Sequence, residues 1–250
     1  FIHLHLHSEY SLLDGGNKID DLLERVKSFG MSAVAVTDHG NLYGAFEFYS
    51  KALAANIKPI LGIEAYVAIG DRKERKQTGI RDGGFHLVLL AENNIGWNNI
   101  VKLSSDSFLN GFYYKPRMDH STLEQYAEGI IAINGHLGSS IAYHLCRFVD
   151  TGEQSDWNNA IKEAKWHAKT FSPNENGDPR FYIELQRHDV QDQIAINPYL
   201  VKLAKELDLP LVCDNDAHYL GLGDWDAHDT LCCISMQKQK GDDDRFVYSK

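Results

Sequence analysis

The chain has 250 residues, of which 43% are hydrophobic and 24% charged, and it carries a formal net charge of −10. This length suits one large α/β domain or two small ones, and the acidic balance excludes a broad basic surface for duplex nucleic acid. A nucleic-acid substrate stays possible, because bound divalent cations offset carboxylates locally.

Cysteine spacing and hydropathy lead us to expect a cytoplasmic protein with no membrane partner. The four cysteines include no CxxC pair, so a disulfide scaffold is not expected. No apolar run approaches the ~20 residues of a membrane span, and no signal peptide is recognisable. The chain opens directly inside a predicted strand and stops without a natural tail, which we interpret as a fragment of a larger protein.

The first predicted element is a strand over residues 2–7, where histidines alternate with apolar residues. Alternation with period two sends successive side chains to opposite faces, so His3, His5 and His7 are expected on one face. The apolar residues between them would pack against a core. We assign His3 a supporting place at most, because it lies deeper in the strand.

Short apolar strands and amphipathic helices then alternate along the chain. Helical spacing is expected over 19–29, 43–55, 158–167 and 198–207, and strands over 33–36, 59–63, 87–90, 130–133, 181–185 and 211–213. This alternation predicts a mainly parallel sheet, either open or closed into a barrel, in a single domain spanning 1–250.

Potential metal ligands follow these strands at their ends. Such side chains meet at one edge in parallel α/β folds, where sites form at the carboxyl ends of strands. His86 is the exception, because it precedes its predicted strand and would have to reach the site from a hairpin or an antiparallel strand. Each residue alone has an ordinary explanation, such as a turn or a helix cap. The joint placement of the nine is what indicates a metal site: His5, His7, Asp14, His39, Glu64, His86, His136, Asp216 and His218.

Nine ligands are too many for one ion but suit two or three ions bridged by carboxylates. Imidazoles mixed with carboxylates favour Zn²⁺, Mn²⁺ or Fe²⁺ over Mg²⁺, which prefers oxygen ligands. Clusters of this kind hydrolyse phosphoesters by generating a bound hydroxide and stabilising phosphoryl charge. The sequence offers no competing nucleophile elbow, P-loop or dinucleotide fingerprint. The other histidines show no such pattern and are interpreted as structural or solvated: His120, His144, His167, His188 and His228.

Six stretches resemble the PHP (polymerase and histidinol phosphatase) family, most closely the PHP domains of bacterial replicative DNA polymerases. They run in order along the chain: HLHLHSEYSLLDG (3–15), TDHGNLYGAFEFY (37–49), IKPILGIEAYV (57–67), GFYYKPRMD (111–119), EGIIAINGHLGS (128–139) and NDAHY (215–219). The resemblance implies a distorted (β/α)7 barrel with a trinuclear metal site at the carboxyl ends of its strands. It implies the same nine ligands, among which we expect Asp14, His39 and Asp216 to be catalytic.

The resemblance also has one departure. His136 stands where many relatives have a cysteine, and imidazole suits Mn²⁺ or Fe²⁺ better than thiolate does. Lys115 and Arg117, in the segment FYYKPR, are predicted to hold a substrate phosphate or stack on a base. The alternative for these two is a surface loop that packs against other polymerase domains.

With all nine positions carrying a competent donor, the resemblance implies a metal-dependent 3′–5′ exonuclease for proofreading. The expected partners are DNA at the primer 3′ end, the remaining polymerase domains of the same chain and other replisome subunits. Two alternatives stay open. The domain could be a structural module whose metals only stabilise the polymerase, or a small-molecule phosphatase of the histidinol phosphatase type.

Overall fold

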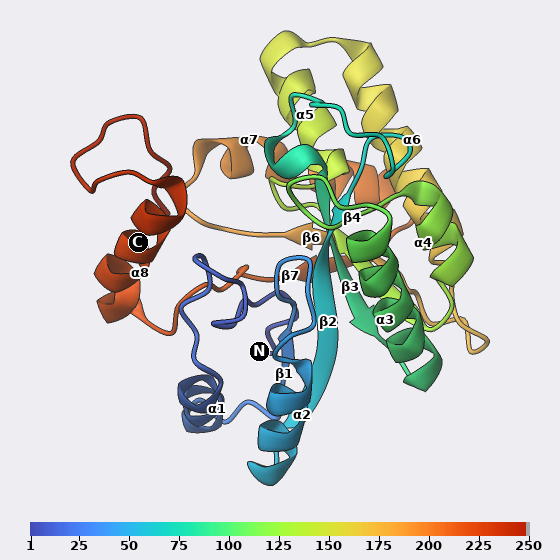
Figure 1. The fold of residues 1–250 in the computed structure, drawn as a ribbon. Helices are drawn as coiled ribbons and strands as arrows, with labels where there is room; N and C mark the ends of the chain where they lie inside the picture. The colour runs from blue at the N-terminus through green and yellow to red at the C-terminus, as the bar shows by residue number, and fades with distance from the viewer. Residues whose placement is uncertain (249–250) are drawn as a thin grey trace.

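The computed structural model describes residues 1–248, whose strands form one curled, seven-stranded sheet surrounded by helices (Figure 1). The order is β1-β2-β3-β5-β6-β7, and β4 pairs with β2 off this path. This is the mixed α/β architecture expected of a distorted barrel. The strands are β1 (Ala33–Val36), β2 (Lys58–Val67), β3 (Phe85–Ala91), β4 (Arg117–Met118), β5 (Ile130–Asn134), β6 (Phe181–Leu185) and β7 (Leu211–Cys213).

Strand β3 runs antiparallel to both of its neighbours, whereas the other strand pairs of residues 1–248 are parallel. His86 pairs with Tyr66 near the end of β2, so it enters the ligand-bearing edge from an antiparallel strand, as predicted. Two predicted boundaries were too short. His86 and Glu64 lie inside their strands, because β2 continues to Val67 through its pairing with β3 and β4.

The N-terminal segment lies between β1 and the residues that follow β7. Its carbonyls accept hydrogen bonds from the N–H groups of Ala35 (2.8 Å to His3 O) and Thr37 (2.9 Å to Leu6 O). On its other side, the N–H of His7 donates to the carbonyl of Ala217 at 3.0 Å. The curled sheet is therefore closed by an irregular segment.

This segment is not the regular strand predicted for residues 2–7. It bends at residues 4 and 5, where the carboxylate of Asp214 accepts hydrogen bonds from the N–H groups of Leu4 (2.6 Å) and His5 (3.1 Å). The bend breaks the alternation of faces. His3 consequently lies beside Asp214 and lines a separate cavity with Leu6, so the prediction that three histidines share one face was wrong.

The helices pack on the outside of the sheet, with α1 and α2 beside β1, and α5 and α6 paired at the opposite end of the molecule (Figure 1). In the main apolar cluster, Ile63, Leu89 and Ile183 of the strands meet Leu103 and Leu200 of the helices. Burial of this surface holds the strand ends in register. The helices are α1 (Ile19–Ser28), α2 (Ala45–Ala54), α3 (Asn94–Leu109), α4 (His120–Tyr126), α5 (Ser140–Thr151), α6 (Gln154–Thr170), α7 (Gln191–Glu206) and α8 (Trp225–Met236), with 3-10 turns η1 (Arg81–Gly83) and η2 (Leu222–Asp224).

Helix α7 begins earlier than the sequence predicts. Pro198 lies inside this helix rather than at its start, and the apolar side chains of Ile196, Leu200 and Leu203 hold the segment on the core. Among residues 1–248, no helix combines the length and the apolar character needed to cross a bilayer.

One buried histidine that is not among the predicted metal ligands makes the free energy of unfolding depend on pH. His167 of α6 stacks on Phe181 at 5.3 Å between ring centroids, and its Nδ1–H donates to the carbonyl of Glu163 at 2.8 Å. Burial lowers the pKa of His167 to about 4. Between about pH 6.5 and pH 4, His167 is therefore protonated in the unfolded chain and neutral in the folded chain. Stability from this residue is complete above pH 6.5 and decreases as the pH falls to about 4.

The expected loss over that window is about 3 kcal/mol, at about 1.4 kcal/mol per pKa unit for a fully buried group. We expect His167→Asn, which retains a side-chain N–H donor, to reduce the pH dependence of unfolding by this amount. Urea unfolding of both proteins at pH 7 and pH 4.5 measures it. Parallel pH profiles would contradict the expectation.

Candidate metal centre

The nine side chains predicted as ligands lie together at one edge of the curled sheet. Each has a nitrogen–oxygen contact of 3.6 Å or less to another member of the group. They come from the N-terminal segment (His5, His7), the turn after it (Asp14), the ends of β1 and β5 (His39, His136), the interiors of β2 and β3 (Glu64, His86) and the segment after β7 (Asp216, His218). The fold thus gathers them from both ends of the chain.

Glu64 is the centre of this group. Its Oε1 lies 3.0 Å from His86 Nδ1 and 3.3 Å from His5 Nε2, and its Oε2 contacts His39 Nδ1 and lies 3.6 Å from His7 Nε2. The side chain is only 2% exposed. With the imidazoles around it, this buried carboxylate would help to hold divalent cations.

Two more carboxylates extend the group on the other side. Asp216 Oδ1 lies 3.2 Å from His5 Nε2 and 3.0 Å from His7 Nε2. Asp14 Oδ2 lies 2.9 Å from His39 Nε2 and 3.6 Å from His218 Nε2. Asp216 therefore connects two histidines of the N-terminal segment, and Asp14 connects histidines from two different segments.

Contacts outside the group orient two of the histidines. Nδ1 of His5 lies 3.0 Å from the buried carboxylate of Glu184, so Nδ1 carries the proton and Nε2 faces the centre. Nδ1 of His7 lies 3.0 Å from Ser11 Oγ, and that hydroxyl donates to Asp38 at 2.7 Å. Such carboxylate–histidine pairs fix the tautomer of metal ligands.

These supporting residues were missed by sequence reasoning. For Glu184 the sequence does contain a clue to a functional role, since it is a charged residue inside the apolar strand FYIEL. In the structure it is fully buried. Asp38 precedes His39 and reads as a helix cap. Its actual role depends on Ser8 and Ser11, which are remote from it in sequence.

Backbone geometry places three more of the predicted ligands, namely Asp216, His218 and His136. Asp216 has a left-handed backbone (φ 49°), and its carbonyl accepts from Nδ1–H of His218 at 2.8 Å, which leaves Nε2 of His218 facing Asp14. Positive φ in a residue other than glycine is uncommon and often occurs at functional sites. Before His136, Gly135 (φ 146°) lies against the backbone of Glu184, where a Cβ atom would come within 2.5 Å of its carbonyl oxygen.

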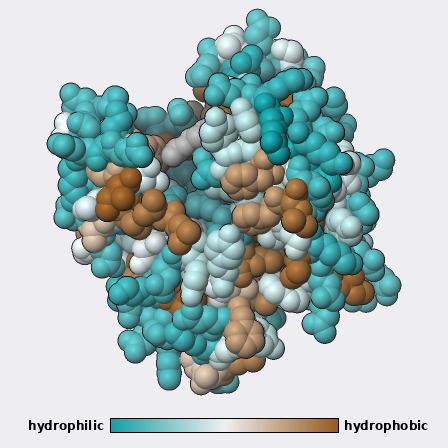
Figure 2. Space-filling view, in the orientation of Figure 1, coloured by the Kyte–Doolittle hydropathy of each residue, from teal (hydrophilic) through white to brown (hydrophobic). Residues whose placement is uncertain are grey.

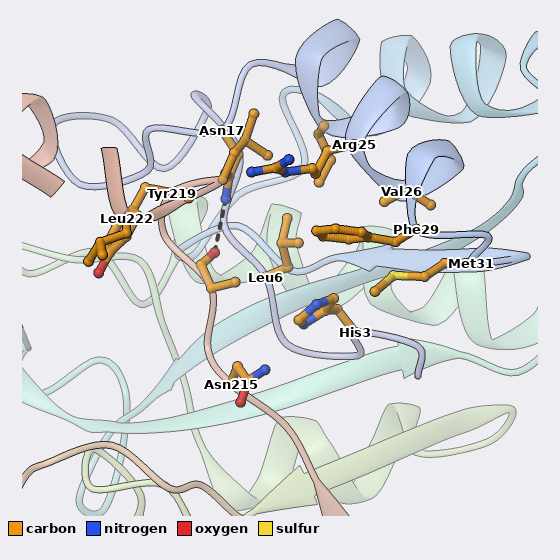
Figure 3. A pocket seen from close by; sticks show the side chains of 14 residues that line it. His3, Leu6, Asn17, Arg25, Val26, Phe29, Met31, Asn215, Tyr219 and Leu222 are labelled. Carbon is orange, nitrogen blue, oxygen red and sulfur yellow. Dashed lines mark hydrogen bonds between the residues drawn. The ribbon is translucent and has the colours of Figure 1, made fainter. Parts of the chain in front are cut away.

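Asn17 connects two ligand-bearing segments, as the close-up in Figure 3 shows for one of them. Its side-chain amide donates to the carbonyl of His7 at 2.8 Å and to that of Ala217 at 3.0 Å. Ala217 stands between Asp216 and His218. The two hydrogen bonds therefore hold His7 near the segment that carries Asp216 and His218.

The residues present fit a group of divalent cations. Six buried atoms of the predicted ligands make no hydrogen bond in the structure: His5 Nε2, His7 Nε2, His39 Nδ1, Glu64 Oε2, His136 Nε2 and Asp216 Oδ1. Leaving buried polar atoms without partners is costly unless another species satisfies them. Three overlapping groups of three ligands each have donor atoms close enough to share one ion: His5, His7 and Asp216; His7, His39 and His218; and His39, Glu64 and His86.

Electrostatics within the group divide the histidines into two kinds. Burial lowers the pKa of a histidine, but Glu64 and Asp14 outweigh this effect at His39 and raise its pKa to about 10. Burial and the neighbouring His39 and His218 lower the pKa of His7 to about 3. Without metal, protons on some histidines balance the carboxylates, and cations would displace those protons on binding.

A cavity of about 1000 Å³ adjoins this group. Asp14, His39 and Asp216, the predicted catalytic residues, line it together with aromatic side chains such as Tyr66 and Tyr143. In Figure 2 the face of the molecule is hollowed between α8 and the part that carries α5. The cavity is large enough for a nucleotide-sized group.

The two predicted substrate-binding residues occupy different environments. Lys115 lines the cavity, where its ammonium lies 3.5 Å from Asp82 and 5.1 Å from the centre of the Tyr66 ring. Arg117 is 2% exposed, and its guanidinium donates to the carbonyls of Gly111, Arg72 and Glu74. Three N–H groups of Arg117 are thus used inside the fold, and only Lys115 of the pair lines the cavity.

Comparison with known proteins agrees with this geometry. The PHP domain family matches residues 3–188, about three quarters of the chain, and the chain belongs to that family. In the solved structures, an amidohydrolase from Chromobacterium violaceum, with bound sulfate and no metal, has a similar fold (TM-score 0.52, 14% identity, 87% of each chain covered).

Within this family, the chain is similar to curated DNA polymerase III alpha subunits. The chain is 44% identical over 248 residues to the DNA polymerase III subunit alpha of Borreliella burgdorferi, and 42% identical over 251 residues to that of Thermus aquaticus. These alignments cover 98% and 99% of this chain but 20% of each relative. The chain thus spans about a fifth of the length of the curated relatives it matches.

Proposed function

We propose that this chain is the PHP domain of a longer replicative DNA polymerase and that it hydrolyses phosphodiesters at a DNA 3′ end with divalent metal ions. The observation that carries the proposal is the convergence of nine ligand-type side chains, six of which hold a buried atom without a hydrogen bond, beside an open cavity. The likeness to DNA polymerase III alpha subunits supports DNA as the substrate.

The chemistry divides between bound ions and side chains. A bound cluster of two or three ions supplies an activated water and stabilises charge on the phosphoryl oxygens. The chain would hold this cluster through the nine residues, with Glu64 and Asp216 each between two or more histidines. We propose Zn²⁺, Mn²⁺ or Fe²⁺, because imidazoles outnumber carboxylates here.

We propose that Asp14, Asp216 and His39 meet the substrate, and His86 shares their partial exposure at 17%. The side chains of Asp14, Asp216 and His39 are 28%, 23% and 17% exposed, whereas those of His5 and His7 are fully buried. Asp14 and His39 form a hydrogen-bonded pair at the cavity wall, with Nε2 of His39 2.9 Å from Oδ2 of Asp14. This exposure supports their proposed catalytic role.

The cavity wall suits a single strand better than a duplex. Aromatic side chains including Tyr43, Tyr66 and Tyr143 line it, and exposed bases stack on such rings. Lys115 offers the positive charge for a phosphate. The acidic chain as a whole has little else to attract duplex DNA.

A nuclease assay on the full-length protein tests the proposal. Labelled single strands and mismatched primers are incubated with Mn²⁺ or Zn²⁺ and without nucleotides. We expect stepwise shortening from the 3′ end by the wild type, and loss of shortening in His7→Ala and Asp216→Asn. Glu47→Gln, on exposed α2, serves as a control. Equal residual activity in the wild type and both site variants would refute the nuclease, and preferred turnover of histidinol phosphate would favour the small-molecule phosphatase.

A further inference from the structure

The last described residues of the chain return to the metal centre. Tyr248 stands 234 positions from Asp14, yet its hydroxyl lies 3.2 Å from Oδ1 and 3.3 Å from Oδ2 of that carboxylate. The same hydroxyl lies 3.2 Å from Nε2 of His218. Two predicted ligands therefore share one neutral hydrogen-bond donor from the C-terminal segment.

Tyr248 is held in place by the helix that precedes it. The indole N–H of Trp225, at the start of α8, donates to the carbonyl of Tyr248 at 2.9 Å. The Tyr248 ring packs against His218 at 4.8 Å and against His228 at 4.9 Å, measured between centroids. The hydroxyl thus approaches Asp14 from a fixed direction.

Helix α8 contacts Asp14 from a second side. His228 Nε2 donates to the carbonyl of Asp14 at 2.7 Å, and Cys232 Sγ lies 3.7 Å from Asp14 Oδ1. Oδ2 instead faces His39 at 2.9 Å. Oδ2 therefore faces the histidines, Oδ1 faces α8, and the Tyr248 hydroxyl reaches both oxygens.

We propose that Tyr248 is a positioning residue of the metal centre, whose hydroxyl donates to Asp14 and orients that carboxylate toward His39 and His218. The inference rests on the proposed metal centre and adds to it a residue outside the matched family region, 3–188. Partners that hydrogen-bond to a ligating carboxylate commonly change metal affinity by about 10–100-fold. Because Tyr248 follows α8, the orientation of Asp14 depends on the position of that helix.

Metal binding by the full-length protein tests this proposal directly. Metal-free wild type, Tyr248→Phe and Tyr10→Phe are titrated with Co²⁺, with visible absorption and equilibrium dialysis as readouts. Asp216→Asn gives the baseline for Co²⁺ bound elsewhere. Tyr10 is the matched control, because its hydroxyl also donates to a partly buried carboxylate (Glu47, 2.6 Å), and Glu47 is not one of the predicted ligands.

We expect Tyr248→Phe to weaken one class of Co²⁺ sites by about 10–100-fold and to alter their absorption, while Tyr10→Phe matches the wild type. Trp225→Phe should shift affinity in the same direction. A merely structural role would lower the melting temperature of both tyrosine variants and leave Co²⁺ affinity unchanged. Co²⁺ binding by Tyr248→Phe that equals or exceeds that of the wild type overturns the inference alone. Absence of Co²⁺ binding above the baseline in the wild type overturns the metal centre as well.

Discussion

Removal of divalent metals is expected to abolish phosphoester hydrolysis and to lower the melting temperature of the protein. The six buried atoms without hydrogen bonds would lose their partners, and the carboxylates around His5 and His39 would again depend on protons for charge balance. Binding to the folded state alone stabilises it by about 2.7 kcal/mol when free metal is 100 times Kd. For a domain of this size, that corresponds to a melting temperature about 5–10 °C lower after chelation.

Calorimetry and the nuclease assay on the same chelated sample measure both effects. Re-addition of Mn²⁺ or Zn²⁺ should restore both, which controls for irreversible unfolding, and Mg²⁺ at the same concentration should restore less. A lower melting temperature with no hydrolysis to lose at any metal concentration would favour the structural module. No change in either quantity would contradict the metal centre.

Glu64→Gln is expected to have the largest effect of any single substitution. It keeps the shape of the side chain but removes the charge that contacts His5, His7, His39, His86 and His136. Because Glu64 would bridge ions rather than support a ligand from outside, hydrolysis should fall by more than about 100-fold, the upper limit typical of supporting residues. Metal content per protein should fall as well.

Glu184→Gln and Glu47→Gln provide a graded control for this substitution. Glu184 contacts only His5 among the ligands, so we expect a loss of about 10–100-fold there. Glu47 lies on exposed α2 and should show no loss. Metal content and hydrolysis rate, measured for all three variants, should decrease most in Glu64→Gln, less in Glu184→Gln and not at all in Glu47→Gln. Equal rates for Glu64→Gln and Glu47→Gln would refute the bridging role.

The positions of most predicted ligands followed from the sequence because they lie in or just after an apolar strand, whereas His5, His7 and Asp14 lie in the irregular N-terminal segment and the turn after it. Burial follows from local pattern, and the carboxyl ends of parallel strands share one edge, whereas the direction of β3 depends on its pairing with β2 and β5. The face of His3 was not predictable, since the bend at residues 4 and 5 depends on Asp214, at the other end of the chain. From the sequence, Arg117 was predicted to bind a substrate phosphate. Only the tertiary fold shows that its guanidinium donates hydrogen bonds to three backbone carbonyls instead.

Supporting residues were harder to predict than ligands. Tyr248 and Asn17 act through bonds that cross most of the chain, and neither belongs to a local pattern that signals a site. A hydroxyl or an amide has many ordinary uses on a surface, so its residue type carries little information. Histidines and acids at strand ends are rarer in combination, and their coincidence is informative.

Closure of the sheet by the N-terminal segment has a consequence for biosynthesis. His5 and His7 leave the ribosome some two hundred residues before their neighbour Ala217 and the predicted ligands Asp216 and His218. Contacts of such long sequence separation form late, after the loop-closure entropy has been overcome. During synthesis the exposed histidines of the nascent chain would meet cellular metals before their partners exist. The centre can assemble only when nearly the whole of this region has been made.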